Sequence, residues 1–97
     1  MFFTITNLDK ANSFDLRAAT RETHLGYLDG IVVQLVLAGP LLNAEGQSIG
    51  SLLVIDAPNR EAAEAFAAAD PYARAGLFQS VTISPFRLVY KDGARAG

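Results

Sequence analysis

Two stretches in the first half of the chain have the apolar pattern of β-strands. From Phe2 to Asn7, aromatic or β-branched residues alternate with polar ones, which is the two-residue period of a strand. Ile31–Ala38 is rich in β-branched residues and almost continuously apolar, so it predicts a buried second strand. Gly39-Pro40 is expected to end that strand.

The second half of the chain predicts two more strands. Asn43–Gln47 is rich in turn-forming residues, and Gly50–Asp56 beyond it predicts a third strand that forms an antiparallel hairpin with the second. Gln79–Tyr90 predicts a fourth strand, in which Pro85 marks a bulge or a sheet edge because proline lacks an N–H group. Lys91–Gly97 is a polar tail that we expect to be frayed.

A helix start follows the first strand. Asn12 or Ser13 can act as the N-cap, and Asp15 lies in the first turn, where the helix dipole favours a negative charge. This helix is expected to run to about Leu28 and to stop at Gly30, a residue suited to the C′ position.

A second helix is predicted in the second half of the chain. Asn59 can cap it, and Arg60–Ala69 consists mostly of alanine and glutamate, which are strong helix formers. Asp70-Pro71 is expected to stop the helix because the residue before a proline avoids the helical conformation. A short helical turn at Tyr72–Gly76 is the last predicted element before the fourth strand.

The predicted order is β-α-β-β-α-β, the split βαβ signature of a ferredoxin-like α+β fold. It predicts one domain, residues 1–90, with an antiparallel four-stranded sheet and two helices on one face; residues 91–97 form the tail. The other face of the sheet is expected to be apolar and uncovered in a monomer. A second copy of the chain would cover it, which predicts a homodimer with two sheets face to face.

Composition narrows the possible partners. The chain has 97 residues, of which 51% are hydrophobic and 19% charged, and the excess apolar surface again favours dimerisation. A net charge of −2 and a pI of about 5.1 argue against a nucleic-acid partner, since such domains are usually basic on one face. The longest apolar run, Ile31–Leu42, is too short and too interrupted to span a membrane. With no signal-peptide pattern at its start, the chain is expected in the cytoplasm.

Two arginines and a histidine share one face of the first predicted helix. Arg17, Arg21, His24 and Leu28 follow one another at helical spacing, so the side chains form a stripe. The arginines could hold a carboxylate or phosphate beside a histidine that transfers a proton. The alternative is a solvated basic face with a surface histidine.

Other candidate site residues lie at element ends. Asp70 is electrostatically misplaced, because the C-terminal end of a helix is negative. It could orient a histidine by accepting the hydrogen bond of one ring nitrogen; the alternative is a helix-stop turn. Gly39-Pro40 and Gly50-Ser51 offer close backbone approach and a hydroxyl group, although turn geometry also explains them. Tyr72 and Tyr27 are expected to be packing residues with a polar tip.

Several kinds of site are excluded by what the sequence lacks. One histidine and no cysteine leave no metal-ligand cluster, and no glycine-rich phosphate loop follows a strand. A triad of Ser51, His24 and Asp70 can be written, but the serine lies in no nucleophile-elbow motif. No metal or cofactor is therefore expected.

The motifs resemble those of the YciI-like (YCII-related) family, in the right order along nearly the whole chain. They are Arg21-Glu22-Thr23-His24-Leu25, Ala38-Gly39-Pro40, Ala69-Asp70-Pro71-Tyr72 followed by Ala75-Gly76, and Ser84-Pro85-Phe86. The resemblance implies a ferredoxin-like fold, a dimeric α/β-barrel assembly, and an architecture similar to that of muconolactone isomerases. Some family members are described as chloromuconolactone dehalogenases. By motif, His24 and Asp70 match the family's proposed histidine–aspartate pair, and Arg21 matches its arginine.

These observations favour a small-molecule enzyme, a lyase, isomerase or dehalogenase-like protein of the muconolactone type, acting on a small anionic compound. His24 would be the acid or base, Asp70 would orient it, and Arg17 or Arg21 would hold the substrate, with Ser51 and Tyr72 in the same site. One alternative is a binding or regulatory module that recognises an anionic metabolite without chemistry. Another is an interaction domain with no occupied cleft.

Overall fold

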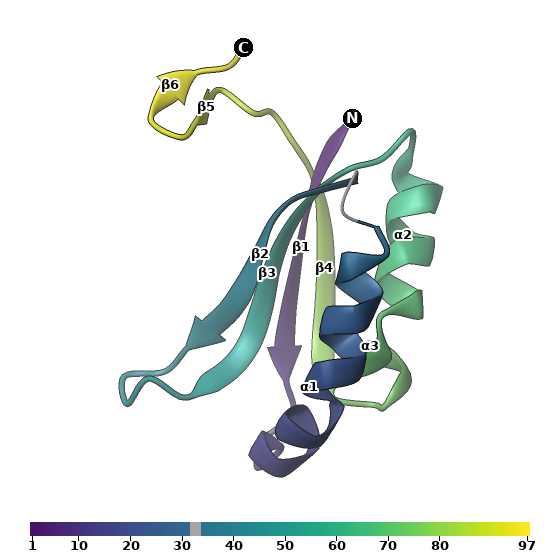
Figure 1. The fold of residues 1–97 in the computed structure, drawn as a ribbon, viewed down its shortest axis with the longest axis vertical. Coiled ribbons are helices and arrows are strands. Elements are labelled where there is room, and N and C mark those ends of the chain that lie inside the picture. Colours follow the sequence, from purple (N-terminus) through teal and green to yellow (C-terminus); the bar gives the residue numbers. More distant parts are fainter. Residues whose placement is uncertain (32–33) are drawn as a thin grey trace.

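Four strands form one antiparallel sheet, and the helices pack on one of its faces (Figure 1). The structure is a computed structural model, and it describes residues 1–31 and 34–97. The elements are β1 (Phe2–Asp9), α1 (Phe14–Asp29), β2 (Leu35–Leu42), β3 (Ser48–Asp56), α2 (Arg60–Ala69), α3 (Pro71–Arg74), β4 (Phe78–Phe86), β5 (Tyr90–Lys91) and β6 (Ala94–Arg95). The sheet order β2-β3-β1-β4 confirms the predicted ferredoxin-like fold.

The helix-covered face of the sheet changes from apolar to polar along its length. Alternate β1 residues Phe3, Ile5 and Asn7 are buried; Ile5 pairs with Leu53 of β3 and Asn7 with Ser51. The apolar end of this face joins α2 in one core, which includes Ile55, Ala63, Phe66 and Ala67. The polar end, at Asn7 and Ser51, lies beneath α1, and Ser51 forms part of the floor of the candidate site.

The edge strand β2 differs most from its prediction. Residues 32 and 33 of the predicted strand lie outside the described residues, and β2 itself begins at Leu35. Most of its side chains are exposed, so the predicted burial is wrong for the single chain: the strand has a neighbour on one side only. Gly39-Pro40 does not end it. Pro40 pairs with Ser51, because an edge strand tolerates a residue without an N–H group.

The outer face of the sheet is apolar only in part, which corrects a second prediction. Thr4 and Thr6 of β1 alternate with the buried residues and point away from the helices, and their β4 partners are Ser84 and Thr82. Apolar residues of that face include Leu52, which is the β3 partner of Thr6, and the paired phenylalanines Phe2 and Phe86 at the strand ends.

The helix ends were predicted closely, with one change of mechanism. α1 ends at Asp29, but Gly30 has a φ of −74° and so adopts the right-handed conformation rather than that of a C′ glycine. α2 spans the predicted residues, and Asn59 caps it by accepting a hydrogen bond from the N–H of Ala62 at 2.8 Å. Among the described residues, no helix has the length and apolar character needed to cross a membrane.

The C-terminal segment forms a small hairpin rather than a frayed tail. β4 ends at Phe86, four residues before the predicted end, and β5 then pairs with β6. The turn is Asp92-Gly93, with φ values of 54° and 77°, and Asp-Gly is a preferred pair for a tight hairpin turn. The hairpin extends away from the sheet and helices (Figure 1). The division at residue 90 stays a prediction.

Candidate active site

The charged stripe of α1 faces the sheet and not the solvent. Arg17, His24 and Leu28 are buried, so the interpretation as a solvated basic face is wrong for the first two. Arg21 differs, because 62% of its side chain is exposed. It makes a long surface contact of 3.7 Å with Glu22 and also lines the cavity described below. The stripe thus combines two buried polar groups with one accessible cation.

His24 and Asp70 form a buried hydrogen-bonded pair. The Nδ1 atom of His24 lies 2.9 Å from Oδ1 of Asp70, and the exposed fractions of the two side chains are 10% and 3%. A carboxylate can only accept this hydrogen bond, so Nδ1 carries the proton. The neutral imidazole then has its lone pair on Nε2, which is the nitrogen available for taking a proton.

Asp70 is held by the local chain conformation. It closes α2 and is also the N-cap of α3, where its Oδ1 accepts a hydrogen bond from the N–H of Tyr72 at 2.9 Å. The predicted helix stop is confirmed. The electrostatic misplacement inferred from sequence is offset, because the carboxylate also meets an unpaired N–H group at the start of α3.

Arg17 is already paired with a residue that the sequence analysis missed. Its Nε and Nη2 donate to the two oxygens of Asp9 at 2.6 and 3.0 Å, and Nη2 also donates to Oγ of Ser51 at 2.9 Å. Asp9 is the last residue of β1, and the two-residue period from Phe3 through Asn7 places it on the helix face. That period was the signal available in the sequence.

Tyr72 lies between the His24–Asp70 pair and the Arg17–Asp9 pair. Its ring stacks on His24 with 4.1 Å between centroids and a 22° interplanar angle, and the guanidinium carbon of Arg17 lies 4.5 Å from the same ring centroid. Burial raises the pKa of the Tyr72 hydroxyl, although the positive charges of Arg17 and Arg21 oppose the rise. Burial lowers the pKa of Arg17, but its contacts with Asp9 outweigh that effect and the net shift is upward.

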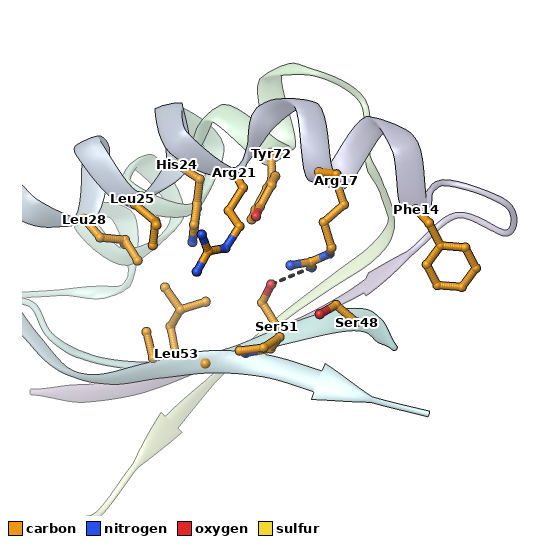
Figure 2. A pocket seen from close by; sticks show the side chains of 14 residues that line it. Phe14, Arg17, Arg21, His24, Leu25, Leu28, Ser48, Ser51, Leu53 and Tyr72 are labelled. Atoms are coloured by element: carbon orange, nitrogen blue, oxygen red, sulfur yellow. Dashed lines mark hydrogen bonds between the residues drawn. The ribbon is translucent and has the colours of Figure 1, made fainter. Parts of the chain in front are cut away.

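These side chains surround a cavity of about 390 Å³ between α1 and the β2–β3 hairpin. Figure 2 shows Arg21, His24 and Tyr72 pointing into it from the helix side, opposite Ser51 and Leu53 of β3. The rest of the lining is mostly apolar and comes from α1 and β2; it includes Phe14, Ala18, Leu25, Leu28, Ala38 and Pro40. The volume suits a small organic molecule with a few polar groups.

The structure gathers five of the six predicted site residues on the cavity wall, and the sixth, Asp70, lies behind His24. Ser51 contacts Arg17 and not the histidine. The close backbone approach of Gly50 is to the neighbouring strand β1, since a Cβ atom there would lie 2.4 Å from the carbonyl oxygen of Asn7, whereas a Cβ atom at Gly39 would have no neighbour within 4 Å. Within residues 1–31 and 34–97, no cluster of three His, Cys, Asp or Glu side chains has an arrangement that would hold a metal ion.

Comparison with known sequences connects this chain to a family. A family model described as the YCII-related domain matches residues 1–87. The protein YciI of Escherichia coli is 33% identical over 98 aligned positions, which cover 93% of this chain and 100% of that protein. An uncharacterised protein of Haemophilus influenzae is 34% identical with the same coverage.

Two solved structures share the fold. A 5-chloro-2-hydroxyhydroquinone dehydrochlorinase (TftG) of Burkholderia phenoliruptrix, solved in complex with 2,5-dihydroxybenzoquinone, superposes with a TM-score of 0.85 at 27% identity, covering 90% of this chain and 94% of that one. An antibiotic biosynthesis monooxygenase superposes with a TM-score of 0.53 at 12% identity over 87% of this chain and 94% of its own, a likeness of fold alone. The chain therefore belongs to the family of YCII-related domains.

Proposed function

We propose that the protein is an enzyme that transfers a proton on a small anionic compound, as a lyase, an isomerase or a dehalogenase-like protein. The hydrogen bond of 2.9 Å between Asp70 and His24 carries this proposal, because it fixes which ring nitrogen holds the proton. Both side chains are buried, and the imidazole lines a cavity of suitable size. A surface histidine or a simple helix-stop aspartate would need none of these features.

In the proposed mechanism, Nε2 of His24 takes a proton from the substrate. Asp70 holds the imidazole in the required tautomer and stabilises the imidazolium that forms. In an isomerisation, the proton returns to another carbon of the same molecule. In an elimination, the electron pair of the broken C–H bond forms a double bond, the leaving group departs with its own electron pair, and the imidazolium later releases the proton to water.

Arg21 is the residue that we assign to the anionic group of the substrate. Arg17 was predicted for the same role, but two of its nitrogens already donate to Asp9 and its charge is balanced there. Arg21 keeps an exposed side chain at the cavity, with only a surface contact to Glu22. Tyr72 supplies a hydroxyl donor that stays protonated at neutral pH, since its pKa is raised.

The dehydrochlorinase supports the choice of reaction class. Its described activity removes chloride and a proton from a hydroxylated ring, and its structure holds a small hydroxyquinone. A ring of that size fits a cavity of about 390 Å³. We therefore extend to this chain the general reaction class, proton removal from a small acidic compound, without its particular substrate.

A screen in deuterium oxide tests the proposal. The panel contains small unsaturated carboxylates, lactones, and hydroxylated or chlorinated rings; NMR follows deuterium incorporation and an ion electrode follows chloride release. His24→Gln should lower the rate of any reaction found by about 10²–10⁴-fold while the compound still binds. Arg21→Gln should weaken binding itself. Arg74→Gln, an exposed arginine that does not line the cavity, is the matched control.

The same screen separates the enzyme from the non-catalytic alternative. If anionic compounds bind through Arg21 but none exchanges a proton or loses a group, the enzymatic proposal is wrong and the binding or regulatory module stands. If no compound of the panel raises the melting temperature of the wild-type protein, both proposals fail. Tight binding at 100 times Kd should stabilise the fold by about 2.7 kcal/mol, which is easily measured.

A homodimer is also part of the proposal. Leu37 of β2 is 51% exposed and pairs with Val54 on the outer face, and Phe86 at the end of β4 is exposed as well. A second copy would cover these side chains with the outer face of its own sheet. Light scattering should give twice the mass of the chain, and Leu37→Glu should reduce it; a wild-type monomer at micromolar concentration would contradict the dimer.

A further inference from the structure

A second buried carboxylate, Asp9, lies at the end of β1. Its partner Arg17 precedes His24 on α1 by seven residues, about two helical turns. The oxygens of Asp9 accept hydrogen bonds from Arg17 at 2.6 and 3.0 Å, and both side chains are buried. The mechanism above gives this ion pair no role. We propose that Asp9 is a positioning residue for His24, and that it acts through Arg17 and Tyr72.

The first link is the orientation of Arg17. A free arginine side chain samples many rotamers, and fixing it has an entropic cost. Two parallel hydrogen bonds to one carboxylate fix the guanidinium plane, which a single contact would not do. Asp9 is itself held by the sheet, because it pairs with Phe78 of β4 and the next N–H, that of Lys10, donates to the carbonyl of Leu77 at 2.9 Å.

The second link is the ring of Tyr72. The guanidinium of Arg17 lies 4.5 Å from its centroid, and the imidazole of His24 stacks on it at 4.1 Å. Arg17 and His24 are seven residues apart, about two helical turns, so a ring inserted between them contacts both. Figure 2 shows Tyr72 in this position, between the two side chains of α1.

The contacts from Asp9 through Arg17 to Tyr72 restrict the orientation of the imidazole more than the hydrogen bond to Asp70 does alone. One hydrogen bond at Nδ1 fixes an edge of the imidazole but lets the ring tilt about that bond. Stacking on Tyr72 restricts the tilt and so aims Nε2 into the cavity. The charge of Asp9 also offsets the repulsion that an unpaired Arg17 would exert on an imidazolium at His24.

The test uses the ligand-free protein and the imidazole as its own probe. His24 is the one histidine of the chain, so the NMR resonances of its carbon-bound ring protons are assigned without ambiguity. The ring of Tyr72, stacked on the imidazole, shifts the frequencies of these resonances. Spectra recorded at acidic and alkaline plateaus compare all variants in the same protonation state. Tyr72→Leu gives the reference for an unstacked imidazole.

Asp9→Asn and Arg17→Lys should both move the His24 resonances from the wild-type positions toward those of Tyr72→Leu. Arg17→Lys keeps the positive charge beside Asp9 but loses the planar fork, so it separates orientation from charge, and it carries the test if Asp9→Asn does not fold. Asp56→Asn is the matched control: it also replaces a carboxylate by an amide and breaks an ion pair, that with the N-terminus at 3.0 Å. It should leave the imidazole resonances in place.

Wild-type His24 resonances in folded Asp9→Asn and Arg17→Lys would overturn the positioning role. This outcome is independent of the substrate screen, although the catalytic meaning of the aimed nitrogen rests on the proposed function. If the resonances move and no compound reacts, the positioning of His24 stands and the enzymatic proposal fails. If a compound reacts and the resonances do not move, the enzymatic proposal stands and the positioning role of Asp9 fails.

Discussion

The two long helices lie on the same face of the sheet and bury opposite kinds of side chain. α2 buries Ala63, Phe66 and Ala67 against the apolar end of the sheet, where it contributes to the core. α1 buries Arg17 and His24, together with Leu28, and covers the polar end at Asn7 and Ser51. The apolar stripe of α2 is what a stable fold requires, whereas burial of charged or polar groups is costly unless each has a partner.

The buried polar groups of α1 have their partners on other elements. Asp9 comes from the end of β1, and Asp70 comes from the junction of α2 and α3. A helix built only for stability would have apolar residues at the positions of Arg17 and His24. From this difference we propose that α2 stabilises the fold and that α1 carries the chemistry. The following predictions test this division from the largest expected effect to the smallest.

Phe66→Ala should have the largest effect on stability. Phe66 is buried in the core and stacks on Tyr27 with 5.4 Å between ring centroids, so its truncation leaves a cavity and should lower the free energy of unfolding by about 3–5 kcal/mol. Urea denaturation measures this loss. Phe14→Ala, at an exposed phenylalanine of α1, is the control and should cost far less. Equal losses would show that α2 has no special part in stability.

Arg17→Met should cost about 3 kcal/mol, because it leaves the buried Asp9 without its partner. The double variant Asp9→Leu with Arg17→Met should recover most of that loss, since replacing both members of a buried pair by apolar side chains is often nearly neutral. Urea denaturation of the two single variants and the double variant gives the coupling energy. A double variant whose loss equals the sum of the two single losses would give a coupling energy of zero and would contradict an energetic interaction between Asp9 and Arg17.

The sequence predicted the limits of the helices and strands better than it predicted which of their side chains are buried. Alanine and glutamate content, the Asn59 cap and Asp70-Pro71 gave the limits of α2 because these signals are local. The burial of β2 was wrong because composition does not tell a central strand from an edge strand. The Asp92-Gly93 turn was a local signal too, but the expectation of a frayed tail rested on polar composition alone.

Of the candidate site, the sequence predicted the α1 stripe and the contribution of Asp70, but not the pairing of Arg17. The spacing along a helix fixes which residues share a face, and the family motif connects His24 with Asp70. The contact between Asp9 and Arg17 depends on how the end of β1 lies under α1, which is a tertiary relation. Asp70 looked misplaced in sequence because its second role, as the cap of α3, depends on a four-residue helix.

The N-cap of α2 should contribute more to stability than the N-cap of α1. Asn59 accepts a hydrogen bond from the N–H of Ala62 at 2.8 Å, so Asn59→Ala should lower the free energy of unfolding by about 1 kcal/mol. Ser13, the N-cap of α1, makes no such bond with its side chain, and Ser13→Ala should change stability by less than about 0.5 kcal/mol. Urea denaturation of both variants measures the contrast. A larger loss at Ser13 would contradict the assignment of its cap.

The smallest effect expected is a dependence of stability on alkaline pH that comes from the site helices. Burial raises the pKa of Tyr72 and of Tyr27, and the charge of Asp70 adds to the rise in both. The folded state therefore binds these protons more tightly than the unfolded chain, whose tyrosines have pKa values of about 10. The stabilisation is complete below that pH and is lost as the pH rises through the higher pKa values of the folded protein.

Urea denaturation between pH 8 and about 11 measures this loss. Tyr72→Phe and Tyr27→Phe should each flatten the fall, and the double variant should flatten it most. Tyr27→Phe also loses the hydrogen bond from its hydroxyl to the carbonyl of Phe66 at 2.9 Å, which lowers stability by about 1 kcal/mol at every pH and leaves the slope as the informative quantity. Curves that run parallel to the wild type above pH 10 would show that neither hydroxyl is held in its protonated form by the fold, and that the buried face of α1 is more hydrated than its contacts indicate.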